Sequence, residues 1–398
     1  MLRRTFPLVL TLVAIATPVS AQSLFGTRGL GVRLEPADAR SRALGNVGIG
    51  LIGLNGSMVN PADLSDVVRR GVTASIQPFY GAENLDGATD NVAGTRFPVV
   101  QILYPIGTRS VFSLGYSGAF DQSWAIETEG QEVIGDNTFH FRDVLSSRGG
   151  ISQVRFSGMY RASPEFSVGA GGGLYTGTLD RHRLREPAST SPDSLPTFVS
   201  DRSWSYSGPF AVVGAQWDPS QRVRIASSVT WNGNLDADGD EGIAGRSYDL
   251  PLRASFGASA VVGRRLLAAV SGEWEGWKDG DYTALGSELG AATTASSSWV
   301  VGAGLEWEEL RTATRVFPLR AGFRYGKLPF HNPGESQPTE WAVSGGIGFR
   351  LAGDDFGPLA VADLGIERGR RQGWEGGVSG ALEENFWRMT ASISLFGR

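Results

Sequence analysis

From Gly71 to the C-terminus the sequence alternates between apolar residues and small or polar ones with a period of two. The run 317–325 reads FPLRAGFRY, and Trp341, Val343, Ile347 and Phe349 fall on one phase of 341–351. Similar alternation recurs in 112–120, 154–160, 223–231, 252–262 and 387–395. Successive side chains of a β-strand point to opposite faces. The chain is therefore predicted to consist of strands that each have one apolar face.

The segments between these strands are of two alternating lengths. Short links lie at 105–108, 163–164, 218–220, 263–264, 310–312 and 352–356. Long polar loops are expected at roughly 83–93, 122–147, 183–202, 235–247, 279–296, 328–338 and 369–384. A soluble sandwich has no reason to keep its short connections at one end. Outer-membrane barrels do, because their periplasmic turns are short and their external loops long. The pattern therefore predicts an all-β fold, a transmembrane antiparallel β-barrel.

The alternating runs number about fourteen, and an even number places both ends of the barrel in the periplasm. The expected strands are 71–82, 94–105, 109–121, 148–162, 165–182, 203–218, 221–234, 248–262, 265–278, 297–309, 315–327, 339–351, 357–368 and 385–396. Tryptophans near strand ends are expected to form interfacial girdles. These are Trp204, Trp217, Trp231, Trp277, Trp307, Trp341 and Trp387.

The remaining composition agrees with the outer membrane of a diderm, Gram-negative-type bacterium. Residues 1–21 are predicted to be a signal peptide, with Arg3 and Arg4 before an apolar run and small residues at 19–21. No later stretch approaches the roughly 18 apolar residues of a transmembrane helix. The absence of cysteine excludes disulfides and thiolate metal sites. The net charge of -5 argues against a nucleic-acid partner.

The stretch 43–67, ALGNVGIGLIGLNGSMVNPADLSDV, precedes every expected strand and lacks their alternation. Its five glycines between Gly45 and Gly56 permit tight turns and a close approach to a barrel wall, at an entropic cost that packing must offset. Asn60 before Pro61 favours extended or turn geometry. We therefore predict three regions: a signal peptide at 1–21, a plug inside the lumen at 22–70, and the barrel at 71–398.

The last strand, FWRMTASISLF at 386–396, resembles the C-terminal assembly signal of outer-membrane barrels. Such signals usually end on an aromatic residue, whereas here Gly397 and Arg398 follow Phe396. The barrel-assembly machinery is accordingly an expected partner, through this strand. Outer-membrane lipids and lipopolysaccharide are the other expected surroundings, and we expect a monomer.

Fourteen strands, an N-terminal segment of about fifty residues and Asn60-Pro61-Ala62 together resemble the FadL/TodX family of outer-membrane transport proteins. Later motifs are similar in their order: YDLP at 248–251 and WEGW at 274–277, then PLRAGFRY at 318–325, a proline-containing loop and WAVSGGIGF at 341–349. The resemblance implies passive uptake of hydrophobic small molecules, such as long-chain fatty acids or aromatic hydrocarbons. It implies no covalent chemistry and no cofactor. A PorV-like branch serves protein secretion or surface attachment instead, and this is the alternative function.

In that family the N-terminal segment closes the barrel as a hatch, ligand is held against the hatch, and a gap in the wall releases cargo sideways. The candidate ligand-binding or hatch residues are Leu44, Gly45, Asn60, Pro61, Ala62 and Leu64. The alternative is that 60–62 only shapes a turn. Pro98 in the second strand and Gly118 in the third are candidate positions for the gap.

Several arginines fall on the polar phase of their strands and are expected to face the lumen. The candidates for contact with a cargo headgroup are Arg155, Arg224, Arg320, Arg324 and Arg350, and Arg253 shares their phase. A guanidinium can grip a carboxylate or phosphate with paired hydrogen bonds. The alternative is that these arginines pair with acidic residues of the strands and the plug.

Catalytic and metal-binding patterns are sparse, and we expect neither an enzyme nor a metal site. His140, His182 and His331 are the only histidines, and no metalloprotease, nucleophile-elbow or phosphate-loop motif occurs. A barrel phospholipase with a Ser/His pair is the enzymatic alternative. The acidic stretch 236–242 begins like a calcium loop, but Glu241 replaces the required glycine and Ser247 the final glutamate. A solvated external loop is the simpler interpretation.

Overall fold

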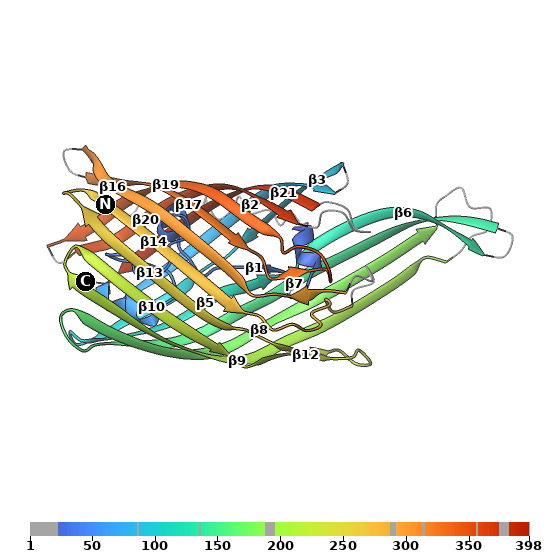
Figure 1. Ribbon diagram of the computed structural model, residues 1–398, viewed down its shortest axis with the longest axis horizontal. Helices are drawn as coiled ribbons and strands as arrows, with labels where there is room; N and C mark the ends of the chain where they lie inside the picture. Colours follow the sequence, from blue (N-terminus) through green and yellow to red (C-terminus); the bar gives the residue numbers. More distant parts are fainter. Residues whose placement is uncertain are drawn as a thin grey trace.

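The computed structural model describes residues 23–85, 87–134, 137–187, 196–286, 292–312, 315–355, 357–373 and 382–397. The predicted signal peptide lies outside them. The described chain forms a closed antiparallel barrel of fourteen strands (Figure 1). The first strand, β2 (Gly71–Leu85), pairs with the last, β21 (Leu382–Phe396), and this pairing closes the wall. Within the described ranges no helix is long and apolar enough to cross a membrane.

Four of the fourteen spanning strands consist of two segments each, so the wall has more segments than strands. The two-segment strands are β3 (Ala88–Arg96) with β4 (Val100–Ile106), β5 (Ser110–Asp121) with β6 (Trp124–Ile134), β10 (Val223–Asn232) with β11 (Asn234–Gly239), and β12 (Arg246–Asp249) with β13 (Leu252–Val262). The others are β2, β7 (Asn137–Arg161), β8 (Phe166–Pro187), β9 (Phe198–Ser220), β14 (Leu266–Gly276), β16 (Ser298–Thr312), β17 (Arg315–Lys327), β19 (Thr339–Asp354), β20 (Gly357–Gly373) and β21.

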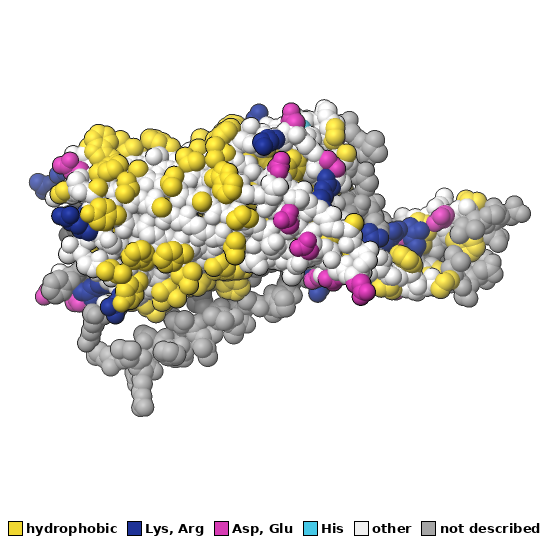
Figure 2. Space-filling model, turned by 90° about the horizontal axis from the view of Figure 1, so that it is seen from below, with side chains coloured by type: hydrophobic (Ala, Val, Ile, Leu, Met, Phe, Trp, Pro, Cys, Tyr) yellow, Lys and Arg dark blue, Asp and Glu magenta, His cyan; other side chains and the backbone are white. Residues whose placement is uncertain are grey.

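Side chains on the apolar phase of the strands point outward. Phe323 and its cross-strand neighbour Val343 are each 48% exposed. Arg324, the next residue along the strand after Phe323, points the other way and is 2% exposed. Hydrophobic side chains gather over the barrel wall, and charged ones gather at its ends and on the projecting arm (Figure 2). An apolar outer band of this kind suits contact with lipid. The period-two interpretation of these strands is thereby confirmed.

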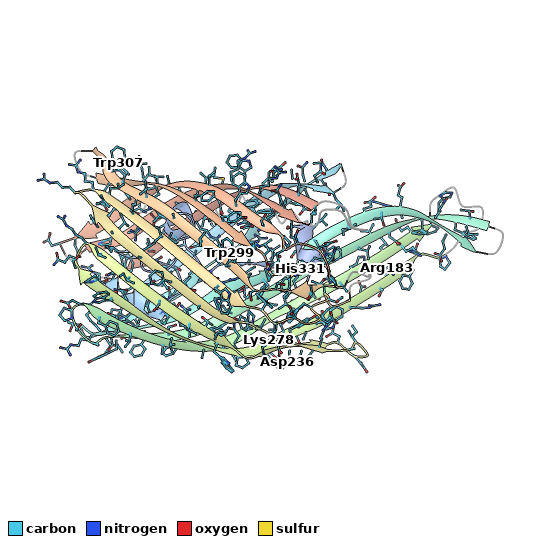
Figure 3. The ribbon with its side chains drawn as sticks, in the orientation of Figure 1. Arg183, Asp236, Lys278, Trp299, Trp307 and His331 are labelled. Atoms are coloured by element: carbon cyan, nitrogen blue, oxygen red, sulfur yellow. The ribbon has the colours of Figure 1, made fainter. Side chains whose placement is uncertain are left out.

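Two predicted girdle tryptophans are exceptions, because they point into the barrel. Trp204 and Trp277 are buried, whereas the other five are exposed on the outer surface. Figure 3 shows one of these, Trp307, at the end of the barrel opposite the arm. The girdle prediction was therefore wrong for Trp204 and Trp277, which pack against aromatic residues of the lumen.

Several of the expected external loops, among them 83–93, 122–147 and 183–202, are largely strands where the structure describes them. Segments β6 to β9 continue past the rest of the wall as a long arm (Figure 1). In the predicted loop 122–147, β6 pairs with β7 from Trp124 opposite Ser147 to Ile134 opposite Asn137. The arm has charged cross-strand pairs, such as Arg142 Nε with Glu127 Oε1 at 2.5 Å, in place of an apolar face. Alternation of hydrophobicity is absent there, which is why the pattern missed these strands.

The N-terminal segment, Ser23–Arg70, lies inside the barrel and packs on its inner wall (Figure 1). Its elements are η2 (Leu24–Thr27), β1 (Val32–Arg33), α2 (Ala39–Ala43) and η3 (Pro61–Asp66). Asp38 caps α2 by accepting from Ser41 N, and Asn60 caps η3 by accepting from Ala62 N. Pro61 at the first position of η3 supplies a suitable φ.

Inward-facing strand glycines make room for this segment. A Cβ at Gly322 or Gly302 would overlap the backbone of Gly45, and a Cβ at Gly214 would overlap Asn60 Oδ1. Gly45 itself has φ +74°, a conformation that side-chain-bearing residues rarely adopt. Wall and segment therefore approach each other at backbone distance, as the glycine content of 43–67 predicts.

Candidate functional site

The inside of the barrel is divided between an apolar half and a charged half. The apolar half is a cluster of aromatic and aliphatic side chains, here called the aromatic lumen cluster. Its buried members are Leu30, Ala119, Phe120, Ile151, Tyr175, Leu179, Trp204, Tyr206, Phe210, Leu235, Ala237, Tyr248, Trp277, Tyr282, Leu285, Ala295 and Phe330. They come from the N-terminal segment, from strands between β5 and β12, and from the external mouth. The external mouth comprises residues 277–285, β15 (Thr294–Ala295) and β18 (Phe330–His331).

The rings of the aromatic lumen cluster are in direct contact, and their polar atoms are satisfied. The ring centroids of Tyr175 and Phe210 lie 5.0 Å apart, and those of Trp277 and Phe330 lie 4.9 Å apart in an edge-to-face arrangement. Tyr175 Oη donates to Asn232 Oδ1 over 2.9 Å, and the Tyr206 hydroxyl donates to Gln122 Oε1 over 2.8 Å. The rings therefore form a closely packed apolar core inside the barrel, and a ligand that parts them would meet apolar surface, which favours hydrophobic or aromatic molecules.

The charged half is a network that joins the N-terminal segment to strands β14 to β21. Arg324 lies 2.6 Å from Glu340 and 2.5 Å from Glu367, and it also contacts Glu35 of the N-terminal segment. On the same side Arg40 binds Glu306 through two nitrogens, at 2.8 and 2.9 Å. Buried charges of this kind are tolerated because each faces an opposite charge. The network ties the segment to the wall.

The predicted lumen arginines face inward, but they have different partners. Arg224 pairs with Asp66 and Asp218, Arg320 pairs with Glu306 and Asp363, and Arg324 belongs to the charged network. Arg350 is exposed and lines a cavity of about 620 Å³ between residues 52–54 and the wall. The alternative interpretation, ion pairing with acidic residues, thus holds for Arg224, Arg320 and Arg324.

Arg155 is buried without an acidic partner among the described residues. It is 5% exposed, and its Nε has no hydrogen-bond acceptor. Its titratable neighbours are Arg253 and Tyr175, and Arg253 is itself engaged with Glu275 at 3.2 Å. Tyr175 belongs to the aromatic lumen cluster, so Arg155 places a free positive charge beside apolar surface. An anionic group attached to an apolar body would satisfy both.

The barrel wall has a break at Phe97–Val99, between β3 and β4. After the break along the chain, β4 pairs with β5 from Val100 opposite Tyr116 to Ile106 opposite Ser110. Before the break, β3 pairs with β2 but, within the described pairings, not with β5. This wall break coincides with Pro98, one of the two predicted positions, because proline cannot donate to a strand ladder.

The N-terminal segment fills the wall break from inside. Strand β1 pairs with the C-terminal end of β5, where Arg33 lies opposite Phe120. Leu34 N donates to Ala119 O over 2.8 Å. A Cβ at Gly118, the second predicted position, would come 2.6 Å from Leu34 Cδ1. Residues 32–34 thus occupy the strand edge that β3 leaves free.

The six predicted hatch residues are all packed against the wall or within the N-terminal segment. Leu44 is fully buried with Val47, Leu51 and Ala269, and Leu64 packs with Leu103 and Met159. Gly45 N donates to Ser344 Oγ over 3.1 Å. Asn60, Pro61 and Ala62 form the start of η3, whose backbone lies where a Cβ at Gly169 would be. Ligand contact by these six residues stays a prediction.

The remaining sequence candidates have structural contacts. Ser296 Oγ lies 3.0 Å from His331 Nε2, and His331 Nδ1 lies 2.9 Å from Asn332 O, so this Ser/His pair joins two segments of the external mouth (Figure 3). Asp236 and Asp238 lie in strand β11 instead of a calcium loop. Across the described residues no group of three histidine, aspartate or glutamate side chains is placed to hold a metal ion.

Comparison with known proteins finds similarity in structure and none in sequence. No protein-family model matches the chain, and no curated protein matches it. A FadL homologue of Pseudomonas aeruginosa superposes with a TM-score of 0.63 at 14% identity, covering 92% of this chain and 99% of that one. The fold is that of the FadL-type barrels.

Two further solved structures share this fold. The toluene transporter TbuX of Ralstonia pickettii superposes with a TM-score of 0.56 at 14% identity, covering 94% of this chain and 100% of that one. The toluene transporter TodX of Pseudomonas putida also gives 0.56 at 14% identity, with 95% and 100% covered. These similarities cover 92% to 95% of this chain, so the predicted resemblance is confirmed at the level of the fold.

Proposed function

We propose that the protein carries hydrophobic small molecules passively inward across the outer membrane, without covalent chemistry. The observation that carries this proposal is the aromatic lumen cluster, a packed set of seventeen buried apolar side chains inside a barrel whose opposite inner side is charged. Water-soluble solutes gain nothing from such a surface, whereas apolar ligands gain by leaving water. The fold supports the proposal, since the similar structures TbuX and TodX are toluene transporters.

The aromatic lumen cluster reaches the wall break. Leu30, Ala119, Phe120 and Ile151 belong to it and lie beside the β1–β5 pairing, and Phe120 touches Trp277 of the mouth with ring centroids 6.3 Å apart. A molecule that moves along the cluster therefore arrives at residues 32–34. We infer that these residues act as the hatch, and that their release from β5 opens a lateral route into the membrane.

The cargo class follows from the two chemistries of the lumen. Aromatic and aliphatic side chains suit hydrocarbon, and the free guanidinium of Arg155 suits a carboxylate at its end. Long-chain fatty acids combine both features, and uncharged aromatic hydrocarbons use the first alone. We propose both as substrates, with Arg155 adding affinity for the acid.

A cross-link between the hatch and β5 tests the gate. The chain contains no cysteine, so Leu34→Cys with Ala119→Cys would create a single pair across the β1–β5 hydrogen bond. We expect the oxidised pair to abolish uptake of toluene and oleate by cells that depend on this barrel, and reduction to restore it. Each single-cysteine variant should transport normally under both conditions.

Undiminished uptake by the fully oxidised pair would contradict the gate. The PorV-like alternative predicts another result, because a secretion component would import neither compound in any redox state. It would instead co-purify stably with large periplasmic or surface proteins. Mass spectrometry of small molecules extracted from the purified barrel separates the two functions independently, since a transporter should retain lipid or hydrocarbon.

A further inference from the structure

Arg181 in β8 is a buried cation whose whole guanidinium group lacks a hydrogen-bond acceptor among the described residues. Only 7% of the residue is exposed, and Nε, Nη1 and Nη2 all lack a partner within the described ranges. It lies at the external end of the lumen, on the same face of β8 as Leu179 and Tyr175 of the aromatic lumen cluster. Its Cζ lies 4.7 Å from the ring centroid of Trp124.

Trp124 adds a fourth donor nitrogen beside the three of Arg181. The residue is 5% exposed, and its indole Nε1 is also buried without an acceptor in the part of the chain that the structure describes. Arg181 and Trp124 line a cavity of about 20 Å³, enough for one water-sized atom. The other lining residues are Leu145, Ser146, His182, Arg183, Ser200, Arg202 and Gly286. The described lining therefore contains three arginines and a histidine but no carboxylate.

Arrangements of this kind are unfavourable unless something accepts the hydrogen bonds. A buried charge without a counterion loses its hydration and gains no compensating ion pair. The stacking on Trp124 is a cation–π contact, which offsets only part of that loss. Arg324 and Arg320 show how the chain meets this cost elsewhere, since Arg324 has three carboxylates and Arg320 has two. At Arg181 the described residues supply none.

We propose that Arg181 and Trp124 form a binding site at the external mouth for one oxygen of an anionic carboxylate or phosphate group. The oxygen would enter the small cavity and accept hydrogen bonds from the guanidinium and the indole. Two sources share this chemistry: the headgroup of an amphipathic molecule whose tail contacts Leu179, and a free oxyanion. The site is separate from Arg155, which lies deeper in the barrel, and it does not depend on transport.

Heat unfolding of the mature full-length barrel in a non-ionic detergent tests this site at constant ionic strength. The probes are sodium decanoate, inorganic phosphate and 1-decanol, which has the same tail length without a charge. A ligand of the folded state raises the melting temperature with the logarithm of its concentration. We expect decanoate, phosphate or both to stabilise the wild-type barrel, with decanoate binding roughly ten times more tightly than 1-decanol.

Arg181→Met should lose the entire response to anions and keep the response to 1-decanol. Without added anion this variant should be at least as stable as the wild type, because it removes an unpaired buried charge. The matched control is Arg142→Met, which changes an exposed arginine of the same arm and should respond as the wild type does. If Arg181→Met does not fold, Arg181→Lys should weaken the anion response roughly tenfold, because an ammonium lacks the guanidinium fork.

The probes also identify the source. A response to decanoate alone assigns the site to an amphipath headgroup, and a response to both anions assigns it to any small oxyanion. No response to either anion overturns the proposal, as does an anion response that persists in Arg181→Met. A site that fails while toluene uptake is intact leaves the transport function unaffected.

Discussion

Arg155 and Arg324 look alike in the sequence, since each is an arginine on the inward phase of an apolar strand. The structure separates them by their partners. Arg324 meets Glu340 and Glu367, which come from the two following strands, whereas Arg155 meets no carboxylate among the described residues. Partnership depends on the register of several strands, which a single sequence does not show. The inward direction of both side chains was therefore predictable from the sequence, but the lack of a carboxylate partner at Arg155 was not.

Replacing Arg155 should change selectivity without stopping transport. A hydrogen bond to a charged group contributes about 1.5–3 kcal/mol, so we expect Arg155→Met to lower oleate uptake about tenfold or more and to leave toluene uptake unchanged. The measurement is initial uptake of each labelled compound. Arg350→Met is the matched control, because Arg350 faces inward at the periplasmic end and should not affect either substrate. An equal loss for oleate and toluene would contradict a headgroup role.

Asp63 should make the docking of the N-terminal segment depend on pH. It lies in η3 outside the spanning strands, and burial raises its pKa to about 7 even though Gly50 N and Asn60 Nδ2 donate to it. The docked segment binds a proton more readily than the free one, whose carboxyl has an ordinary pKa near 4. Docking is therefore strongest below about pH 4 and weakens as the pH rises to about 7.

Single-channel conductance measures this effect between pH 5 and pH 8. We expect more frequent openings at pH 8 in the wild type and a flat response in Asp63→Asn. Glu35 does not confuse this window: Arg42 and Arg324 outweigh its burial and lower its pKa to about 2, so its ion pairs are intact above pH 5. A pH response that survives Asp63→Asn would assign the titration to another group.

At the scale of elements, the positions of all fourteen strands follow from the alternation in the sequence. Each expected range overlaps a strand of the barrel, from β2 at Gly71–Leu85 to β21 at Leu382–Phe396. The arm was missed because β6 and the external half of β7 are charged on both faces. Strand β1 was also missed, since two residues that pair with β5 carry no periodic signal. Its place depends on the wall break, which is a tertiary feature.

Strand β9 shows why the aromatic lumen cluster was not foreseen. Its Trp204, Tyr206 and Phe210 fall on one phase and point inward, whereas Val213 and Trp217 point outward to lipid. Both faces of the strand are therefore apolar, and alternation alone assigns the large residues to the lipid side. A strand with large apolar residues on both phases was the available signal for an apolar lumen.

Adding a methyl group to the wall under η3 should loosen the N-terminal segment. A Cβ at Gly169 would come 2.6 Å from Ala62 N, and backbone cannot shift as a flexible side chain can. We therefore expect Gly169→Ala to raise single-channel conductance and the protease sensitivity of residues 43–67. Gly172→Ala is the control on the same strand, because its Cβ would meet only Phe210 O at an ordinary 3.5 Å. Identical conductance of the two variants would contradict close packing of η3.

At the scale of the whole molecule, barrel and N-terminal segment are joined by different forces. The barrel is closed by the thirteen-residue register between β2 and β21, a pairing in which the N-terminal segment takes no part. The segment is held by ion pairs such as Arg40 with Glu306, Arg224 with Asp66 and Arg33 with Glu275. Water that enters an emptied lumen would hydrate these wall charges, so losing the segment should leave the barrel folded.

Deleting Gln22 to Arg70 after the signal peptide should therefore yield a folded, open channel. We expect a large and steady single-channel conductance in place of small or rare openings, because residues 32–34 no longer fill the wall break and 43–67 no longer fills the lumen. Heat-modifiable migration on gels checks that the barrel is folded. The oxidised Leu34→Cys/Ala119→Cys pair provides the opposite control, a channel held closed. If the barrel without residues 22–70 folds and conducts no better than this closed form, the N-terminal segment is not what blocks the lumen.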